Sequence, residues 1–377
     1  MAGIYIHIPF CKQACNYCDF HFSINHELKE KVTVAILKEM ELQKNYLSSE
    51  PIQSIYFGGG TPSLLSKQEL QQIFNRLHQL FNIENSAEIT LEANPDDLTA
   101  EKIAELQSCG INRLSIGIQS FYNKDLRWMN RVHTAEQAES AVKLSQDMGF
   151  NNISIDLIYG LPHSTTDEWE ENLNKAFELN IQHLSCYSLT VEPRTPLAAF
   201  IKKGKVQDLK EELTATQFEL LMKTAYENGW IHYEISNFCR ENYYSKHNAS
   251  YWTGEKYLGL GPSAHSFNGL TRQWNISNNH KYLIALKDEK VPFKVESLSI
   301  TQQFNEYIIT SLRTMWGTDL EKIKNRFNAT YSNEVILKAK KFENSGSLLC
   351  SDKKISLTNK GKLLADRIIL ELMEHEG

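Results

Sequence analysis

Three cysteines lie close together near the start of the chain, in the stretch CKQACNYCDF (residues 11–20). Cys11, Cys15 and Cys18 follow the spacing C-x3-C-x2-C, and Phe20 stands where a fourth thiol could follow. Thiolates bind soft metal centres. A cubane [4Fe–4S] cluster takes one ligand per iron, so three thiolates hold three irons and leave the fourth open. The motif predicts a metal centre, and an iron–sulfur cluster is the leading candidate.

A zinc site is the alternative for this motif. Cys3His is a common tetrahedral ligand set, and His7 and His21 lie close to the cysteines in the sequence. Clustered cysteines in a reducing compartment more often hold metal than form disulfides. The other cysteines are scattered, and we expect each to be a buried small hydrophobic residue. They are Cys109, Cys186, Cys239 and Cys350.

Length and charge restrict the kind of protein. The 377 residues suit one barrel-sized domain with a smaller unit. The chain has 40 Lys and Arg against 46 Asp and Glu, so it lacks the cationic surface that nucleic-acid binding requires. No apolar run approaches the roughly 20 residues that span a bilayer, and no signal-peptide pattern opens the chain. We expect a cytoplasmic protein without a nucleic-acid partner or a transmembrane segment; peripheral membrane contact is left open.

Six short apolar runs alternate with longer segments of helical periodicity in the first half of the chain. The expected strands are Ile4–Ile8, Ser54–Phe57, Glu88–Leu91, Arg113–Ile118, Ile153–Leu157 and His183–Tyr187. The expected helices are Glu27–Leu47, Lys67–Phe81, Ala100–Ser108, Ala135–Met148 and Asp167–Leu179. This alternation predicts an α/β fold of βαβ units, whose parallel sheet curls toward a barrel. We expect a partial (β/α)6 barrel over residues 1–200.

Two further units are expected downstream. Residues 201–298 begin with the helical segment Leu209–Glu227 and continue with a polar and aromatic stretch, so we treat them as an α/β extension. Residues 299–377 predict a small winged-helix-like domain. Its expected elements are the helices Gln302–Thr314, Leu320–Phe327, Val335–Asn344 and Asn359–Glu374 and the strand Lys353–Leu357. DNA binding would be the usual role of such a domain, but the acidic balance of the chain argues against it.

The cysteine motif resembles that of the radical S-adenosylmethionine superfamily, whose CxxxCxxC loop binds a [4Fe–4S] cluster through three cysteines. In that family the fourth iron chelates the amino and carboxylate groups of S-adenosylmethionine, and the loop follows the first strand of a partial (β/α)6 barrel. The stretch YIHIPFCKQACNYCDF is similar to the branch that contains oxygen-independent coproporphyrinogen III oxidase and related haem chaperones. The similarity extends over nearly the whole chain, including the C-terminal domain typical of the branch.

Other residues match cofactor contacts of this family. The run GGGTP (residues 58–62) follows a strand candidate, and glycines there let backbone groups approach a ligand. Polar residues follow later strands, at the end where barrels place ligand contacts. Without the resemblance, these aromatic and polar residues would be structural or surface residues. The resemblance implies S-adenosylmethionine contacts at Tyr5, Tyr17, Gly59, Gly60, Thr61, Glu92, Gln119, Arg131 and Asp156.

Two features bear on the choice between haem binding and porphyrinogen oxidation. The oxidase has a fourth cysteine, CxxxCxxCxC, and an N-terminal extension, whereas this chain has Phe20 and only ten residues before Cys11. The stretch HNASYW (residues 247–252) matches HNxxYW, a motif associated with haem binding in the chaperones. A neutral imidazole is a common axial ligand of haem iron, although a lone histidine beside aromatic residues is more often a packing residue. We expect His247 to be the iron ligand.

The sequence therefore predicts a haem chaperone of the radical S-adenosylmethionine type. Its expected cofactors are a [4Fe–4S] cluster, S-adenosylmethionine and haem, and its expected partner is an acceptor protein that the sequence does not identify. The alternative is an oxygen-independent coproporphyrinogen III oxidase, which decarboxylates propionate side chains. The sequence does not decide whether S-adenosylmethionine is cleaved. If it is, the chemistry belongs to the cofactor, and the protein excludes water and sets the geometry.

Overall fold

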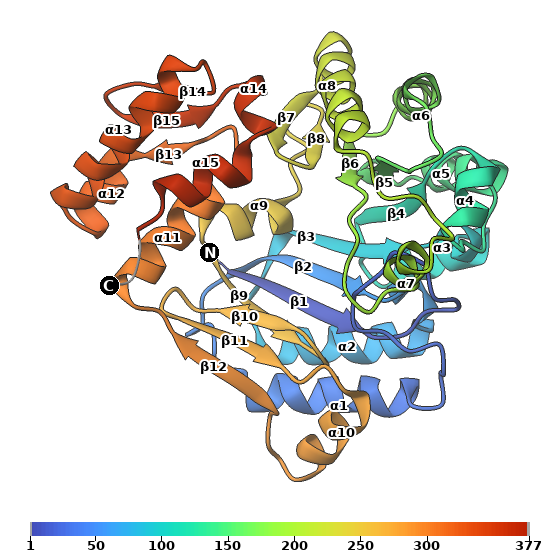
Figure 1. The fold of residues 1–377 in the computed structure, drawn as a ribbon. Coiled ribbons are helices and arrows are strands. Elements are labelled where there is room, and N and C mark those ends of the chain that lie inside the picture. The colour runs from blue at the N-terminus through green and yellow to red at the C-terminus, as the bar shows by residue number, and fades with distance from the viewer. Residues whose placement is uncertain (1, 375–377) are drawn as a thin grey trace.

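The computed structural model describes residues 2–374 and contains six parallel strands in sequence order (Figure 1). They are β1 (Ala2–Ile8), β2 (Ile52–Gly59), β3 (Ile83–Ala93), β4 (Arg113–Gln119), β5 (Ile153–Tyr159) and β6 (His183–Ser188). Each expected strand lies within the corresponding observed strand. Helices on the connecting segments are α1 (Lys29–Leu42), α2 (Lys67–Leu80), α3 (Ala100–Ser108), α4 (Asn123–Trp128), α5 (Ala135–Asp147) and α6 (Thr166–Glu178). The sequence patterns missed the short helix α4.

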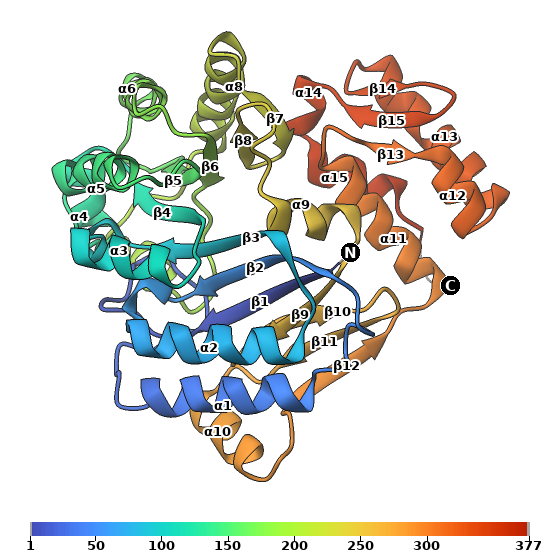
Figure 2. The ribbon, with the colours of Figure 1, turned by 180° about the vertical axis from the view of Figure 1, so that it is seen from behind.

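The strands form because their apolar side chains can be buried against these helices. In β1 the side chains of Ile4, Ile6 and Ile8 are at most 2% exposed. Figure 2 shows α1 and α2 lying along one face of β1 to β3. Capping boxes fix the N-termini of α2, α5 and α6, because the N-cap hydroxyl and the third helical residue satisfy each other's backbone groups. The carboxyl ends of the parallel strands consequently meet at one edge of the sheet.

The sheet continues beyond the six parallel strands on both sides. At one side β9 (Lys256–Leu260) runs parallel to β1, and three antiparallel strands follow it. These are β10 (His265–Phe267), β11 (Thr271–Asn275) and β12 (Phe293–Ser297). At the other side β8 (Asn237–Cys239) pairs with β6, and β7 (Ile231–Glu234) pairs with β8. Residues 201–298 therefore complete one mixed, twelve-stranded sheet, which the sequence patterns did not predict.

Helix α7 (Pro196–Lys202) leads into the extension, which supplies the helices α8 (Glu211–Glu227) and α10 (Asn279–Lys287) and the helix α9 (Lys246–Thr253), which carries the HNxxYW residues. Helix α10 packs against α1, and α8 packs against α6. Among residues 2–374, no helix has both the length and the apolar character that crossing a bilayer requires.

The C-terminal residues form a unit with its own apolar core and its own three-stranded sheet. Its helices are α11 (Ile300–Leu312), α12 (Leu320–Arg326), α13 (Ala329–Asn344), α14 (Asn359–Lys362) and α15 (Ala365–Leu372). Its strands are β13 (Thr318–Asp319), β14 (Leu348–Cys350) and β15 (Lys354–Leu357). Helix α13 begins six residues before the expected start, and the expected last helix is divided into α14 and α15. The unit meets the main sheet through α11 and α9, which lie side by side.

A buried carboxylate joins α1 to the extension. Glu39 is fully buried and accepts hydrogen bonds from the amide of Gly261 (2.7 Å), from Asn275 Nδ2 (2.6 Å) and from the hydroxyl of Tyr282 (2.5 Å). Burial raises the pKa of Glu39, and these donors oppose that rise. The carboxylate thus satisfies donors from the segment after β9, from β11 and from α10 at once.

Glu39→Ala is expected to lower the free energy of unfolding by about 3 kcal/mol or more, because it leaves several buried donors without an acceptor. Chemical denaturation measures this loss. Glu41→Ala is the matched control on the same helix; its side chain forms solvent-exposed ion pairs with Lys44 and Arg76, so its loss should change the free energy of unfolding little. Equal effects of the two substitutions would contradict the role assigned to Glu39.

Candidate functional site

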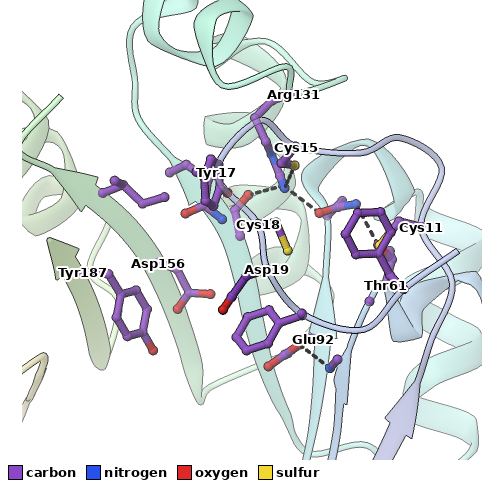
Figure 3. A pocket seen from close by; sticks show the side chains of 18 of the residues that line it. Cys11, Cys15, Tyr17, Cys18, Asp19, Thr61, Glu92, Arg131, Asp156 and Tyr187 are labelled. Atoms are coloured by element: carbon purple, nitrogen blue, oxygen red, sulfur yellow. Dashed lines mark hydrogen bonds between the residues drawn. The ribbon is translucent and has the colours of Figure 1, made fainter. Parts of the chain in front are cut away.

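A cavity of about 580 Å³ opens at the carboxyl ends of the parallel strands and collects most of the predicted site residues (Figure 3). The predicted residues that line it are Cys11, Cys15, Tyr17, Cys18, Gly59, Gly60, Thr61, Glu92, Gln119, Arg131 and Asp156. They come from the loop after β1, from β2 and the residue pair that follows it, from β3, β4 and β5, and from the segment after α4. Tyr5 and His247 do not line this cavity.

The cysteine loop is held over the cavity by backbone hydrogen bonds. Cys11 donates its amide to Ser23 O (3.0 Å), and Asn16 donates its amide to Met129 O (3.1 Å). Asn130 Nδ2 donates to Ala14 O (2.7 Å), so the segment after α4 fixes the loop from the other side. The three cysteines are half-buried and free of disulfides. The loop therefore presents three thiols from a fixed backbone.

The thiols of Cys11 and Cys18 hold their protons in the absence of metal, because burial raises the pKa of Cys11 to about 11 and that of Cys18 to about 12. Arg131 Nη1 donates a hydrogen bond to the sulfur of Cys15 (3.4 Å). Metal binding must displace the thiol protons, so it is expected to be stronger at higher pH.

The donor set fits a [4Fe–4S] cluster better than a zinc ion. His7 donates from Nε2 to His21 O (2.8 Å), and its other ring nitrogen lies 3.1 Å from the hydroxyl of Tyr5. His21 Nε2 forms a hydrogen bond with Asn279 Oδ1 (2.8 Å). A tetrahedral zinc site would need one of these imidazoles as fourth ligand, whereas a cubane cluster needs only the three thiolates. Within residues 2–374, no group of three or more His, Cys, Asp or Glu side chains is already arranged to hold a metal ion.

The glycine run after β2 forms the wall beside the cysteine loop. Gly59 has a φ of 106°, which favours glycine, and a Cβ at this position would lie 2.6 Å from the ring of His7. A Cβ on Gly60 would lie 2.6 Å from the backbone oxygen of Phe10. Gly60 and Thr61 donate their amides to Ile8 O (2.9 Å) and Phe10 O (2.7 Å), so the run is tied directly to the start of the cysteine loop.

Two half-buried carboxylates face the cavity from β3 and β5. Glu92 accepts hydrogen bonds from the hydroxyl of Tyr56 (2.8 Å) and the amide of Gly59 (3.2 Å). Asp156 accepts one from the hydroxyl of Ser115 (3.4 Å). Burial raises the pKa of Glu92 to about 7 and that of Asp156 to about 6. The two groups can accept hydrogen bonds from hydroxyl or ammonium groups of a ligand, and such a ligand would favour their ionised forms.

Arg131 connects three parts of the site. Its Nη2 donates to Asn94 Oδ1 (2.6 Å) and to Gly117 O (2.8 Å), while Nη1 donates to the sulfur of Cys15. Gln119, at the end of β4, has a φ of 72°, a strained conformation that turns the chain at the cavity wall. The sequence analysis did not single out Asn94, although it lies two residues after Glu92 in the LEANP stretch at the end of β3.

Tyr5 and His247 line a second, smaller cavity of about 180 Å³ next to the first. Glu92 and Asp156 face both cavities, so they form part of the wall between them. Arg113, from β4, reaches into the smaller cavity and is 2% exposed, with its Nε lacking a hydrogen-bond partner. The sequence analysis missed Arg113, because the cationic residue looked like the charged start of a strand.

His247 is sealed inside the protein. It is 1% exposed, its Nδ1 lies 2.9 Å from Ser54 Oγ, and its Nε2 lies 2.9 Å from the hydroxyl of Tyr251. Burial lowers the pKa of His247 to about 3, so the ring is neutral. Both ring nitrogens are engaged in this arrangement, and neither is free to bind iron. Trp252 points elsewhere and lines a cavity of about 150 Å³ beside the C-terminal unit.

Comparisons with known proteins agree with this geometry. Residues 5–176 match the model of the Radical SAM superfamily. Heme chaperone HemW of Bacillus subtilis (strain 168) is 32% identical over 98% of both chains. Heme chaperone HemW of Lactococcus lactis subsp. lactis (strain IL1403) is 34% identical over 97% of this chain and 95% of its own.

A solved structure shares the fold. Coproporphyrinogen III oxidase (HemN) from Escherichia coli superposes with a TM-score of 0.85 at 23% identity, over 99% of this chain and 90% of that chain. This likeness concerns the fold alone, whereas the sequence similarity extends along the full chain of the HemW proteins. The chain belongs to the Radical SAM superfamily and, within it, to the family of proteins named heme chaperone HemW.

Proposed function

We propose that this chain is a haem chaperone that holds a [4Fe–4S] cluster and S-adenosylmethionine in the large cavity and transfers haem to an acceptor protein. The observation that carries the proposal is the gathering of three thiols and the expected cofactor contacts around one cavity, in a chain whose near-full-length relatives are named heme chaperone. Phe20 in place of a fourth cysteine also favours the chaperone over the oxidase.

The predicted site residues that line the cavity are each assigned a part in holding these groups. Cys11, Cys15 and Cys18 provide the iron ligands, and Arg131 positions Cys15. Gly59, Gly60 and Thr61 leave room for the amino and carboxylate groups of S-adenosylmethionine. The ribose hydroxyls and the carboxylate are assigned to Glu92, Gln119, Arg131 and Asp156, and the adenine to Tyr17. A bound cluster would supply the electron if S-adenosylmethionine is cleaved reductively; in either case this chain's residues orient the ligand and exclude water.

The same proposal covers the fold, the units and the location. The six parallel strands with their helices are assigned to a partial (β/α)6 barrel over residues 1–200, followed by the extension 201–298 and a winged-helix-like unit 299–377. The separate apolar core of the last unit supports its division from the rest. The cytoplasm is the proposed location, and the partners are haem and an acceptor protein.

Tyr5 and His247 need a change of conformation to take the roles proposed from the sequence. Tyr5 would have to turn from the small cavity toward the methionine end of S-adenosylmethionine. His247 would have to give up its bonds to Ser54 and Tyr251 before it could bind iron. The role of His247 is therefore tested separately from haem binding itself.

An anaerobic haem titration of the reconstituted protein, followed by absorbance, tests the proposal. We expect a saturable Soret band and no turnover of coproporphyrinogen III. Turnover without saturable haem binding would favour the oxidase. If His247 binds iron, His247→Ala shifts the band, while His280→Ala, at an exposed position of α10, leaves it unchanged. An unchanged spectrum in His247→Ala would show that His247 does not bind the haem iron, and the proposed chaperone function would stand.

A further inference from the structure

One side of the cluster cavity is apolar and is not used by the groups assigned above. Phe20, Phe22, Ile158, Tyr187 and Leu189 line it. Phe20 is 67% exposed and Tyr187 is 46% exposed, although both belong to the wall of a cavity. Phe22 is half-buried, and Ile158 and Leu189 are buried behind the two exposed rings. Single exposed apolar residues are common, but two exposed aromatic rings backed by apolar side chains at one opening are typical of a binding surface.

The apolar residues extend from beside the cysteine loop, at Phe20, to the far side of the cavity, at Tyr187. In Figure 3, Tyr187 and Asp156 stand on one side of the cavity, and Cys11, Cys15 and Arg131 stand on the other. Phe20 directly follows Asp19, at the end of the cysteine loop, so it borders the cluster ligands and the opening together. The cavity thus offers a polar half to S-adenosylmethionine and an apolar half to a second ligand.

Cavity size also distinguishes this place from the neighbourhood of the HNxxYW residues. Sites for small molecules usually measure about 300 to 1,000 Å³. The cavity beside His247 has about 180 Å³ and the one beside Trp252 about 150 Å³, whereas the cluster cavity has about 580 Å³. A porphyrin is a wide, flat, apolar ring, so it fits an open apolar wall better than either small cavity.

We propose that haem docks at the mouth of the cluster cavity, with the ring of Phe20 against the face of the macrocycle. This inference rests on the proposed haem-chaperone function and gives the place where the haem is held. Aromatic side chains pack well on such a face. The carboxylates of Asp19 and Glu192 line the same cavity. They repel the haem propionates, so the apolar edge of the ring enters and the propionates remain in solvent.

A shared opening couples the two ligands. A haem seated on Phe20 covers the entrance to the polar half, where S-adenosylmethionine is proposed to bind. Release of S-adenosylmethionine must then become slower while haem is bound. The coupling offers a second measurement that does not depend on the haem spectrum.

The first experiment compares haem affinity in Phe20→Gln and Phe293→Gln, both reconstituted with iron and sulfide. Each substitution removes one exposed phenyl ring; Phe293 is 44% exposed on the edge strand β12 and does not line the cavity. We expect the Kd for haem to rise about tenfold in Phe20→Gln, because the contact buries part of one phenyl ring. Phe293→Gln should retain the wild-type Kd. Iron content checks that each variant holds its cluster.

The second experiment measures the release of labelled S-adenosylmethionine with and without haem. Haem should slow release in the wild type, and Phe20→Gln should lose most of this effect. Tyr187→Gln provides a second variant on the same wall and should also weaken haem binding. Saturable haem binding with an unchanged Kd in Phe20→Gln and Tyr187→Gln would overturn the docking site and leave the chaperone function intact. Absence of saturable haem binding in the wild type would overturn both.

Discussion

Alanine at any one of Cys11, Cys15 or Cys18 is expected to give a folded protein that holds no [4Fe–4S] cluster after anaerobic reconstitution. The reason is the number of ligands: three thiols from one loop are the protein ligands that the cavity provides for three irons. The fourth iron already lacks a protein ligand, so the loss of one thiol leaves two of the four irons without one. Iron analysis and visible absorbance should show a fall of about tenfold or more in bound cluster.

Cys109→Ala is the matched control for this experiment. Cys109 is also a free, half-buried thiol, at the C-terminal end of α3, and it does not line the cavity. Its replacement should leave the iron content unchanged. Circular dichroism should be the same in all variants, because backbone hydrogen bonds hold the loop in place. If the reconstituted wild type contained zinc instead of iron, the predicted iron–sulfur cluster would be wrong and the zinc alternative would be favoured.

Glu92→Gln is expected to stabilise the protein without its cofactors and to weaken S-adenosylmethionine binding by at least about tenfold. The side chain is half-buried in the wall between the two cavities, and desolvation there raises its pKa to about 7. A glutamine keeps an oxygen for the hydroxyl of Tyr56 and carries no charge to desolvate. It loses the charged acceptor that a ligand hydroxyl or ammonium would meet.

The sign of the pH dependence follows from the raised pKa. Between about pH 4.5 and pH 7 the folded protein binds more protons at Glu92 than the unfolded chain does, so stability falls as the pH rises through this range. Below the range the stabilising contribution is fully present. At pH 8 the apoprotein of Glu92→Gln should therefore be more stable than the wild type by up to about 3 kcal/mol.

Denaturation at pH 5 and pH 8 measures this difference. Glu178→Gln, at the exposed C-terminal end of α6, removes the same charge and should change stability little at either pH. Asp156, whose pKa burial raises to about 6, adds a smaller pH dependence of the same sign that remains in Glu92→Gln. The raised pKa would be contradicted if the wild type became more stable from pH 5 to pH 8 and Glu92→Gln were no more stable than the wild type at pH 8.

The sequence predicts the six parallel strands because their side chains are buried, and buried parallel strands appear as continuous apolar runs. The strands β7 to β12 do not have this pattern. All five residues of β12 are exposed, and β8 and β10 have three residues each. The strands β7 to β12 form because neighbouring strands offer unpaired edges to hydrogen-bond with. Which edges are available depends on the tertiary structure and not on the local sequence.

The cluster cavity could be predicted from local motifs, since each motif follows a strand and the strands end together. The surroundings of His247 could not. The HNxxYW pattern gives the helix spacing of His247 and Tyr251, four residues apart, but not the direction in which that helix face points. Packing of α9 against β1 and β2 turns both residues inward, against Ser54 and Tyr5. Arg113 and the apolar wall also depend on contacts between distant segments.

The pairing of β1 with β9 has a consequence for synthesis on the ribosome. Ile6 pairs with Phe57 on one side and with Leu260 on the other. Translation proceeds at about 5 to 20 residues per second, so roughly 10 to 40 seconds pass between the emergence of these two neighbours. During that interval the nascent chain exposes one unpaired edge of the apolar strand β1. Slow translation or a shortage of ribosome-associated folding factors should therefore reduce the yield of this protein through aggregation.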